Sequence, residues 1–310
     1  MTIQRVATGS QQQALLQQIT RANVALVQSQ TQVSSGKVSS TYGGYGDKTA
    51  VLEAARAAAA RADAYQQTTK LALDQVDLQN TQLTALSDIA QQLRDAVTKA
   101  SGTGDGSTLM TDVNSLFEQA VQILNSRDAN GNYIYGGEKD NVPPVTANSI
   151  SDLLALPDAA SAFQNGTQTR SVATGDGQTI KTGALASDIG SQLLQAMRDV
   201  AAFNQTEAFG TNLSGTQSDF LTGMIQSTTD AATTVNNATA VNGYAYSRLE
   251  DAASQQQSYS TLYKGFVSDL EDVDMGEAVM RLNQNQVALQ AALQVSSRLN
   301  QLSLLNFLGN

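Results

Sequence analysis

Cysteine, histidine and tryptophan are absent from this 310-residue chain, and proline occurs only three times. The first two absences exclude zinc sites built from cysteine or histidine, cysteine nucleophiles, haem bound through histidine and every Ser-His-Asp arrangement. Only carboxylate, lysine or tyrosine side chains remain for catalysis. The lack of cysteine does not decide the compartment, because both cytosolic and exported proteins can do without disulfides.

Basic side chains are also scarce, since 18 lysines and arginines stand against 28 aspartates and glutamates and the formal net charge is -10. We expect no nucleic-acid partner, because phosphate binding needs clustered lysine and arginine. We expect no membrane partner either, because no segment reaches the roughly 18 apolar residues of a membrane span. The first fifteen residues lack the apolar core of a secretory signal, so we expect export without a conventional cleaved signal.

All three prolines lie between residues 143 and 157, so no helix in the flanking segments has to break. Residues 131–212 combine these prolines with glycine turns, two β-like pieces (TRSVAT and QTIKTG) and a predicted helix over Ser187–Phe203. At the start of this segment, Asn130-Gly131 indicates a turn that leads into an expected strand at Tyr133–Tyr135. We therefore expect helical arms around an inserted surface domain of mixed structure.

The two ends of the chain have coiled-coil spacing and almost no charge, since only Arg5 and Arg21 are charged between residues 1 and 36. Polar surface without charge suits burial against other protein, because an amide costs less to desolvate than an ion. The simpler interpretation is an antiparallel helical pair within one domain. We predict that the apolar stripes of both ends form an assembly interface. Its residues are Leu15, Ile19, Leu26, Val33, Val279, Leu282, Leu289, Leu293, Leu299, Leu302, Leu305, Phe307 and Leu308.

Between the ends and the insert, the pattern predicts long helices. One seam with steps of three and four residues runs from Ala62 to Val97, and a shorter helix follows over residues 109–123. Helical rhythm returns from Thr216 and continues through Val241, Tyr259, Leu262 and Phe266.

The expected fold class is mainly α, with a terminal coiled coil formed by both ends, a long helical rod bundle and an inserted small mixed or β-rich domain. The predicted divisions are residues 1–38 with 275–310 for the terminal coiled coil, 39–130 with 213–274 for the rod, and 131–212 for the insert.

Candidate chemical motifs are weak. Gly46-Asp47-Lys48-Thr49 lacks the spacing of a phosphate-binding loop, and the segment from Asp128 to Gly131 fits a turn better than a calcium loop. Asp176 and Asp188 could pair as acid and base only if the fold brought them together. The acidic run Asp269–Asp274 favours a helix N-terminus over a cation site. We expect no catalytic, cofactor or metal site.

Three segments resemble the axial family of bacterial flagellar proteins. The first segment, here called the exit segment, is similar to the family's exit into its variable domain; it covers residues 130–145 and reads NGNYIYGGEKDNVPPV. The second is similar to the family's Ser-Ser-Gly-Lys joint; it covers residues 30–38 and reads QTQVSSGKV. VSDLEDVDMGEAVMRLNQNQVALQAALQVSSRLNQLSLLNFL, residues 267–308, resembles the terminal helix almost throughout. The family usually continues its joint with an arginine and paired acids, whereas Val38 and a Tyr-Gly-rich stretch stand here.

The resemblance implies a structural, non-enzymatic subunit of the extracellular flagellum that stacks with copies of itself. Within the family, the exit segment and the ending SLLNFL are more similar to the members that join hook to filament. The partners this implies are the adjacent hook-associated protein, flagellin and a cytoplasmic export chaperone on the C-terminal helix, with a type III export route.

Two alternatives remain open from the sequence. Flagellin, the filament subunit, shares the same terminal helices. An extracellular glycan-binding or hydrolytic protein would need its chemistry in the insert, where only carboxylates and tyrosines are at hand.

Overall fold

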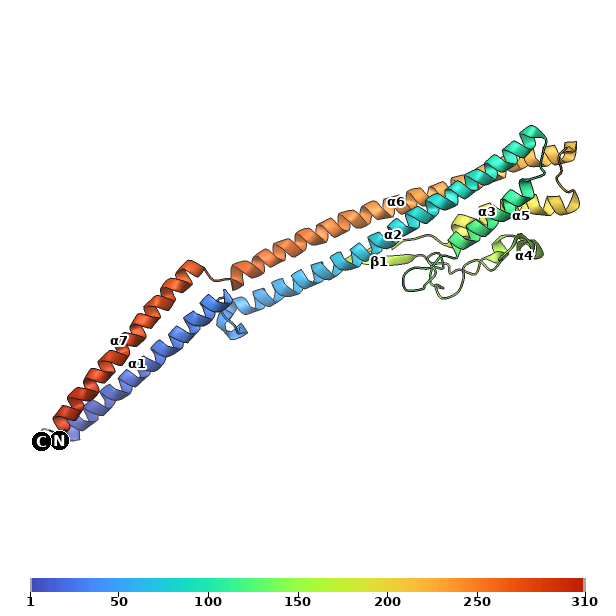
Figure 1. Cartoon of the computed structure of the whole chain (residues 1–310). Coiled ribbons are helices and arrows are strands. Elements are labelled where there is room, and N and C mark those ends of the chain that lie inside the picture. Colours follow the sequence, from blue (N-terminus) through green and yellow to red (C-terminus); the bar gives the residue numbers. More distant parts are fainter. Residues whose placement is uncertain (1, 309–310) are drawn as a thin grey trace. The chain divides into compact units, whose positions relative to one another are not determined.

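The structure is a computed structural model that describes the backbone of residues 2–308 and the side chains of residues 12–299 and 301. It is mainly helical, with one two-stranded antiparallel sheet in the described part, as the sequence predicted. The elements of four or more residues are α1 (Thr2–Ser35), the 3-10 segment Tyr42–Lys48, α2 (Thr49–Thr103), α3 (Leu109–Leu124), α4 (Ile150–Ala155), β1 (Arg170–Gly175), β2 (Gln178–Thr182), α5 (Ala186–Thr206), α6 (Gly215–Glu271) and α7 (Met275–Leu308) (Figure 1).

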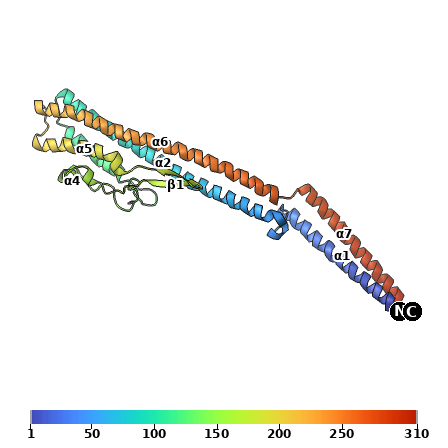
Figure 2. The same ribbon diagram turned by 180° about the vertical axis from the view of Figure 1, so that it is seen from behind.

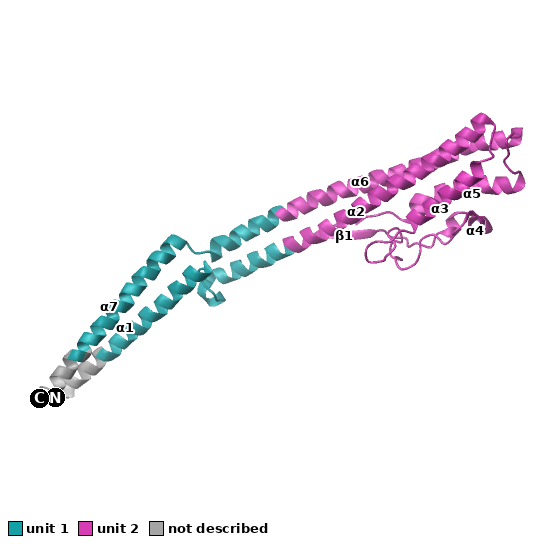
Figure 3. Cartoon of the chain, viewed as in Figure 1, with its two compact units in different colours: residues 1–61, 258–310 teal, residues 62–257 magenta. Residues whose placement is uncertain are grey.

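Contacts divide the chain into two compact units (Figure 3). Unit 1 contains residues 1–61 and 258–310, and unit 2 contains residues 62–257. The three-part division expected from the sequence stays a prediction, since the boundaries at 38, 130 and 212 are not tested by this two-unit division.

In unit 1, α1 and α7 lie side by side and run antiparallel, with both chain ends at the same end of the pair (Figures 1 and 2). The first turns of α2 and the last turns of α6 complete this unit. The pair follows from the sequence, because both segments are long, lack proline and carry one apolar stripe each.

The core of unit 2 is built by α2, α3, α5 and α6. The predicted seam of α2 is confirmed, because Leu83, Leu86 and Leu93 are fully buried at steps of three and seven residues. They pack with Phe117 of α3 and Leu193 of α5 in one cluster. The aliphatic residues whose spacing predicts the helix are therefore the same residues that are buried in the core.

The β-hairpin packs against the long helices of unit 2. Ile180 of β2 is buried among Val76 of α2 and Leu249 of α6. At its tip, Gln256 Nε2 donates to the Thr174 carbonyl at 2.8 Å. The strand pieces TRSVAT and QTIKTG were thus placed correctly by the sequence.

The helix expected after Thr216 is confirmed as α6, although part of its apolar pattern is exposed, and one expected strand is not formed. Tyr133–Tyr135 is not a strand, because the Tyr133 amide donates to the Asp140 carbonyl while the Ile134 amide donates to Ser126, so no single neighbouring strand is paired. In α6, Val241 is 66% exposed and Tyr259, Leu262 and Phe266 are also exposed. The buried positions there include two polar side chains, Gln256 and Ser260, which an apolar pattern does not show.

Tyr135 lies in the core with its hydroxyl buried and without a hydrogen-bond partner in the described part of the chain. Burial raises the pKa of this phenol. Tyr135→Phe is expected to raise the free energy of unfolding by about 1 kcal/mol, since it removes an unpaired buried polar group. The measurement is urea unfolding followed by circular dichroism.

Tyr133→Phe is the matched control in the same motif. The Tyr133 hydroxyl accepts a hydrogen bond from Arg127 Nη2 at 2.6 Å, and the guanidinium lies 4.4 Å from the ring centroid. Tyr133→Phe removes this hydrogen bond, so we expect its free energy of unfolding to fall by about 1 kcal/mol. If both variants changed the free energy of unfolding in the same direction, the inference that the Tyr135 hydroxyl is unpaired would be rejected.

Candidate assembly interface

The facing sides of α1 and α7 form a seam that is only partly apolar. From α1, Leu15, Ile19, Leu26 and Val33 are half-buried, with Ser29 and Gln32 buried between them. The α7 side of the seam repeats at steps of four and three residues, and its members are Ala278, Leu282, Asn285, Leu289, Ala292 and Ser296. The spacing is that of a coiled coil.

The structure separates the predicted assembly residues into groups. Six lie in the seam, namely Leu15, Ile19, Leu26, Val33, Leu282 and Leu289. Three lie outside it and are exposed, namely Val279, Leu293 and Leu299. The side chains of Leu302, Leu305, Phe307 and Leu308 lie outside the described residues. The assembly role of all thirteen residues stays a prediction.

The sequence pattern missed the polar contact of the seam. Asn285 Nδ2 donates to Ser29 Oγ at 2.7 Å and approaches the Ala25 carbonyl at 3.2 Å. A polar residue at a seam position favours the register that satisfies it. The signal was present in the sequence, because Ala278, Asn285 and Ala292 recur every seven residues.

Both helices also carry apolar side chains away from the seam. On α1, Leu16, Val24 and Val27 are more than half exposed, and on α7 so are Met280 and Val287. Val287 is five residues from Leu282 and Val24 is five from Ile19, a spacing that places them on the far side of each helix. A helix with apolar residues on several faces suits a site surrounded by other protein.

Threonine hydroxyls on this outer face of α1 are turned toward the helix backbone. Thr20 Oγ1 donates to the Leu16 carbonyl and Thr31 Oγ1 to the Val27 carbonyl, both at 2.9 Å. The hydroxyls are therefore satisfied within the helix. This lowers the cost of covering the outer face with another protein surface.

Next to the seam, a charged cluster ties the segments together at residues 36–38 and 271–274, here called the joint. Glu271 at the end of α6 is only 5% exposed. Its Oε1 accepts from Lys37 Nζ at 2.6 Å and from Arg56 Nη2 of α2. The Lys37 hydrogen bond is the main cause that holds the pKa of Glu271 below its ordinary value.

Backbone hydrogen bonds complete the joint. The Val38 amide donates to the Glu271 carbonyl at 2.7 Å, and the Val273 amide donates to the Gly36 carbonyl at 2.9 Å. Gly36 has φ +69°, which favours glycine after the end of α1. The Ser-Ser-Gly-Lys motif thus supplies a turn and a cation to one buried carboxylate.

The acidic run before α7 caps the helix, as predicted. Asp274 Oδ1 accepts from the amides of Gly276 at 2.8 Å and Glu277 at 3.1 Å. A side chain in this place satisfies amides that have no partner within the helix. Within the described residues, no group of three or more acidic side chains is arranged to hold a metal ion.

The exit segment is held by turns and one carboxylate. Asp128 Oδ1 accepts from the amides of Asn130 and Asn132, so the predicted turn is confirmed. Glu138 accepts from the amides of Thr167 at 2.8 Å and Gln168 at 2.7 Å, and these bonds lower its pKa to about 2.

The glycine before Glu138 is required by the close approach of two backbone segments. Gly137 has φ +64°, and a Cβ there would lie 2.6 Å from the Gln168 carbonyl oxygen. The Gly-Gly-Glu sequence of the exit segment therefore fixes where residues 166–168 cross it.

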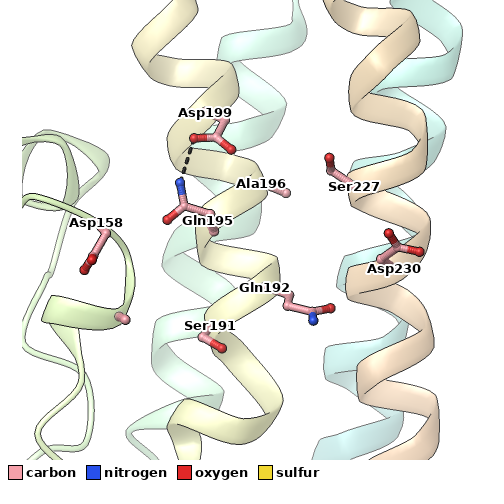
Figure 4. A pocket seen from close by; sticks show the side chains of 9 residues that line it. Asp158, Ser191, Gln192, Gln195, Ala196, Asp199, Ser227 and Asp230 are labelled. Carbon is pink, nitrogen blue, oxygen red and sulfur yellow. Dashed lines mark hydrogen bonds between the residues drawn. The ribbon is translucent and has the colours of Figure 1, made fainter.

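Unit 2 has an acidic cleft of about 470 Å³ between α5, α6 and the loop after α4. Figure 4 shows Asp199 on α5 and Asp230 on α6, with Asp158 on the loop. The Asp199 carboxylate accepts from Gln195 and that of Asp230 from Gln226. These carboxylates are thus engaged with the protein itself.

The fold does not bring together Asp176 and Asp188, the two carboxylates that were weighed as a possible acid and base pair. Asp176 accepts from the Tyr65 hydroxyl at 2.9 Å at the tip of the hairpin. Asp188 lies in the first turn of α5 and lines a different cleft, between β2, α5 and α6. The fold therefore offers no acid and base pair from these two residues.

The fold defines a class of long helical proteins in which the two terminal helices of one chain, α1 and α7, pack against each other. Two family models match the sequence: the bacterial flagellin N-terminal helical region over residues 6–140 and the C-terminal helical region over residues 225–308. Together they cover well over half of the chain. The chain belongs to the bacterial flagellin family and is a structural protein of the extracellular flagellum.

Solved structures show the same fold. One is a flagellar hook-associated protein from Vibrio parahaemolyticus, with 15% identity, a TM-score of 0.59, and coverage of 72% of this chain and 97% of that one. Another is FlgL from Bacillus cereus, with 13% identity, a TM-score of 0.52, and coverage of 70% and 98%. No curated protein sequence matches the chain. None of the described helices is long and apolar enough to cross a membrane.

Proposed function

We propose that this chain is the subunit that joins the flagellar hook to the flagellin filament, corresponding to hook-associated protein 3. The observation that carries the proposal is the outer apolar face of the α1 and α7 pair in a flagellin-family protein. Such a face is unfavourable in water and becomes favourable when neighbouring subunits cover it.

The likeness to two hook-associated structures favours the junction over the filament. We expect each subunit to contact further copies, the adjacent hook-associated protein on one side and flagellin on the other. A catalytic role is not part of the proposal, because the carboxylates considered above are engaged with the protein or do not share a cleft.

An export chaperone is proposed to cover α7 before assembly. Exposed Met280, Val287 and Leu293 would otherwise promote premature self-association. We expect a truncated chain that lacks the last forty residues to lose chaperone binding in a pull-down. Retained binding would reject α7 as the chaperone's site.

Deletion of the gene tests the junction role directly. We expect cells with complete hooks and no filaments, together with flagellin monomers released into the medium, because the filament has no base on which to grow. The measurements are electron microscopy of the cell surface and immunoblotting of the medium. Loss of filaments without released flagellin would instead identify the chain as flagellin, and intact filaments would reject both roles.

A further inference from the structure

Asparagine is followed by glycine three times in the chain, at Asn130-Gly131, Asn165-Gly166 and Asn242-Gly243. Because glycine has no side chain, its backbone nitrogen can approach the side-chain carbonyl carbon of the preceding asparagine. The nitrogen attacks that carbon, its proton leaves with the amide group as ammonia, and a five-membered succinimide forms. Water then opens the ring to aspartate or isoaspartate. The reaction needs an asparagine side chain that can rotate and a backbone that can adapt to the ring.

The Asn242-Gly243 pair is held in place by helix α6. Asn242 is buried, and its Nδ2 donates to the Val76 carbonyl of α2 at 2.9 Å. Gly243 lies in the middle of the helix, so its backbone is fixed by the regular helical hydrogen bonds. Ring formation would require the bond to Val76 to break and the helix to unwind. We therefore expect this pair to be unreactive in the folded chain.

The Asn165-Gly166 pair is held by hydrogen bonds at both reacting groups. Asn165 Nδ2 donates to Ser187 Oγ at 3.1 Å and to the Gly166 carbonyl at 2.8 Å, and Asn165 Oδ1 accepts from the Ser187 amide at 3.1 Å. Gly166 is buried, and its amide donates to the Gly136 carbonyl at 2.8 Å. The side chain and the attacking nitrogen are thus both fixed by residues more than twenty positions away.

The Asn130-Gly131 pair differs from the other two. Both residues are exposed at the turn where the exit segment begins. The Asn130 backbone amide donates to Asp128 Oδ1, but no hydrogen bond holds the Asn130 side chain among the residues that the structure describes. The Gly131 amide is restrained by one bond, to the Asp128 carbonyl at 2.9 Å. An exposed turn of this kind opens at low cost in free energy.

We propose that Asn130 is the site at which the folded chain is modified spontaneously, by deamidation to aspartate and isoaspartate. The product places a new carboxylate two residues from Asp128, whose Oδ1 accepts from the amides of residues 130 and 132. Like charges repel each other, and isoaspartate also lengthens the backbone by one atom. Both changes oppose the turn, so the modification loosens the start of the exit segment.

The test is incubation of the full-length protein in mildly alkaline buffer, followed by peptide mapping with mass spectrometry. In the folded protein, we expect Asn130 to be converted at least about tenfold faster than Asn165 and Asn242, because the other two pairs must first be released from their surroundings. In concentrated urea the three pairs should be converted at similar rates, since they share the same dipeptide. The proposal is overturned if Asn130 is no faster than the others in the folded protein, or if its advantage persists in urea.

Asn130→Gln is the control for the effect on the turn. Glutamine keeps the amide at this exposed position, but it would have to close a six-membered ring, which forms much more slowly. The Asn132 amide donates to Asp128 Oδ1 at 3.0 Å, so its hydrogen-exchange protection reports the turn. We expect this protection to fall during incubation in the wild type and to persist in Asn130→Gln. Equal loss in both proteins would overturn the inference that modification of Asn130 loosens the turn.

Discussion

Glu271→Gln is expected to reduce hydrogen-exchange protection of the Val38 and Val273 amides about tenfold. These amides form the backbone bonds of the joint. Glu271 is buried and accepts from two cations, and a hydrogen bond to a charged group contributes about 1.5–3 kcal/mol. The Lys37 and Arg56 side chains are 47% and 35% exposed, so solvent reduces the effect to about 1.4 kcal/mol for the joint.

Glu277→Gln makes the same change in an exposed pair and is the matched control. Glu277 and Arg281 lie 3.2 Å apart on α7 with side chains 60% and 45% exposed. Such pairs contribute little to stability, so the joint amides should keep their protection. Equal loss in both variants would show that Glu271 has no special role.

The joint should also loosen in acid. The pKa of Glu271 lies below its ordinary value near 4.5, mainly because Lys37 donates to it. A carboxyl whose pKa is lower in the folded state stabilises that state fully when the pH is above its ordinary pKa. The stabilisation is lost as the pH falls through the pKa of the folded state. Protection of the Val38 amide should therefore decrease below about pH 4.5 in the wild type and much less in Glu271→Gln.

Regular helices packed by aliphatic residues could be predicted from the sequence. In α2 the large apolar residues Leu83, Leu86 and Leu93 stand where the helix meets the core, so periodicity alone locates the buried face. The same reasoning succeeds only in part in α7. It locates Leu282 and Leu289, but the seam also contains Ala278, Asn285 and Ala292, while larger apolar residues such as Leu293 lie outside it. Where small and polar residues make the contact, hydrophobicity points to another face.

The joint could not be predicted, because it depends on contacts between distant segments. Lys37 and Glu271 are 234 residues apart, and no sequence pattern in either segment indicates that the two side chains are in contact. The Ser-Ser-Gly-Lys segment resembles a motif of the family, but its physical role depends on the buried Glu271 carboxylate that Lys37 contacts. The exit segment is similar, since Glu138 binds amides about thirty residues away.

Leu289→Gln and Val287→Gln separate the two faces of α7 and are expected to differ sharply. Leu289 is half-buried in the seam, whereas Val287 is 64% exposed on the outer face. Leu289→Gln should weaken both the α1 and α7 pair and polymer assembly. Val287→Gln should leave the pair intact and raise the critical concentration for assembly roughly tenfold, because about 1.5 kcal/mol of burial in the polymer is lost.

An engineered disulfide reports the pair independently of assembly. Ser29 and Asn285 face each other across the seam, and the chain has no cysteine of its own. With both residues replaced by cysteine, oxidation should form one intramolecular disulfide in the wild-type background and with Val287→Gln, and much less with Leu289→Gln. Polymer is measured by sedimentation of the variants without the added cysteines.

The two readouts together decide which face does what. If Val287→Gln assembled at the same critical concentration as the wild type, no neighbouring subunit would cover the outer face, and the assembly role of that face would be rejected. Efficient disulfide formation with Leu289→Gln would show that the seam does not depend on Leu289. The expected result is that Val287→Gln impairs assembly while the disulfide still forms, and that Leu289→Gln impairs both. This result would show that the seam holds α1 and α7 together within one subunit and that the outer face contacts neighbouring subunits.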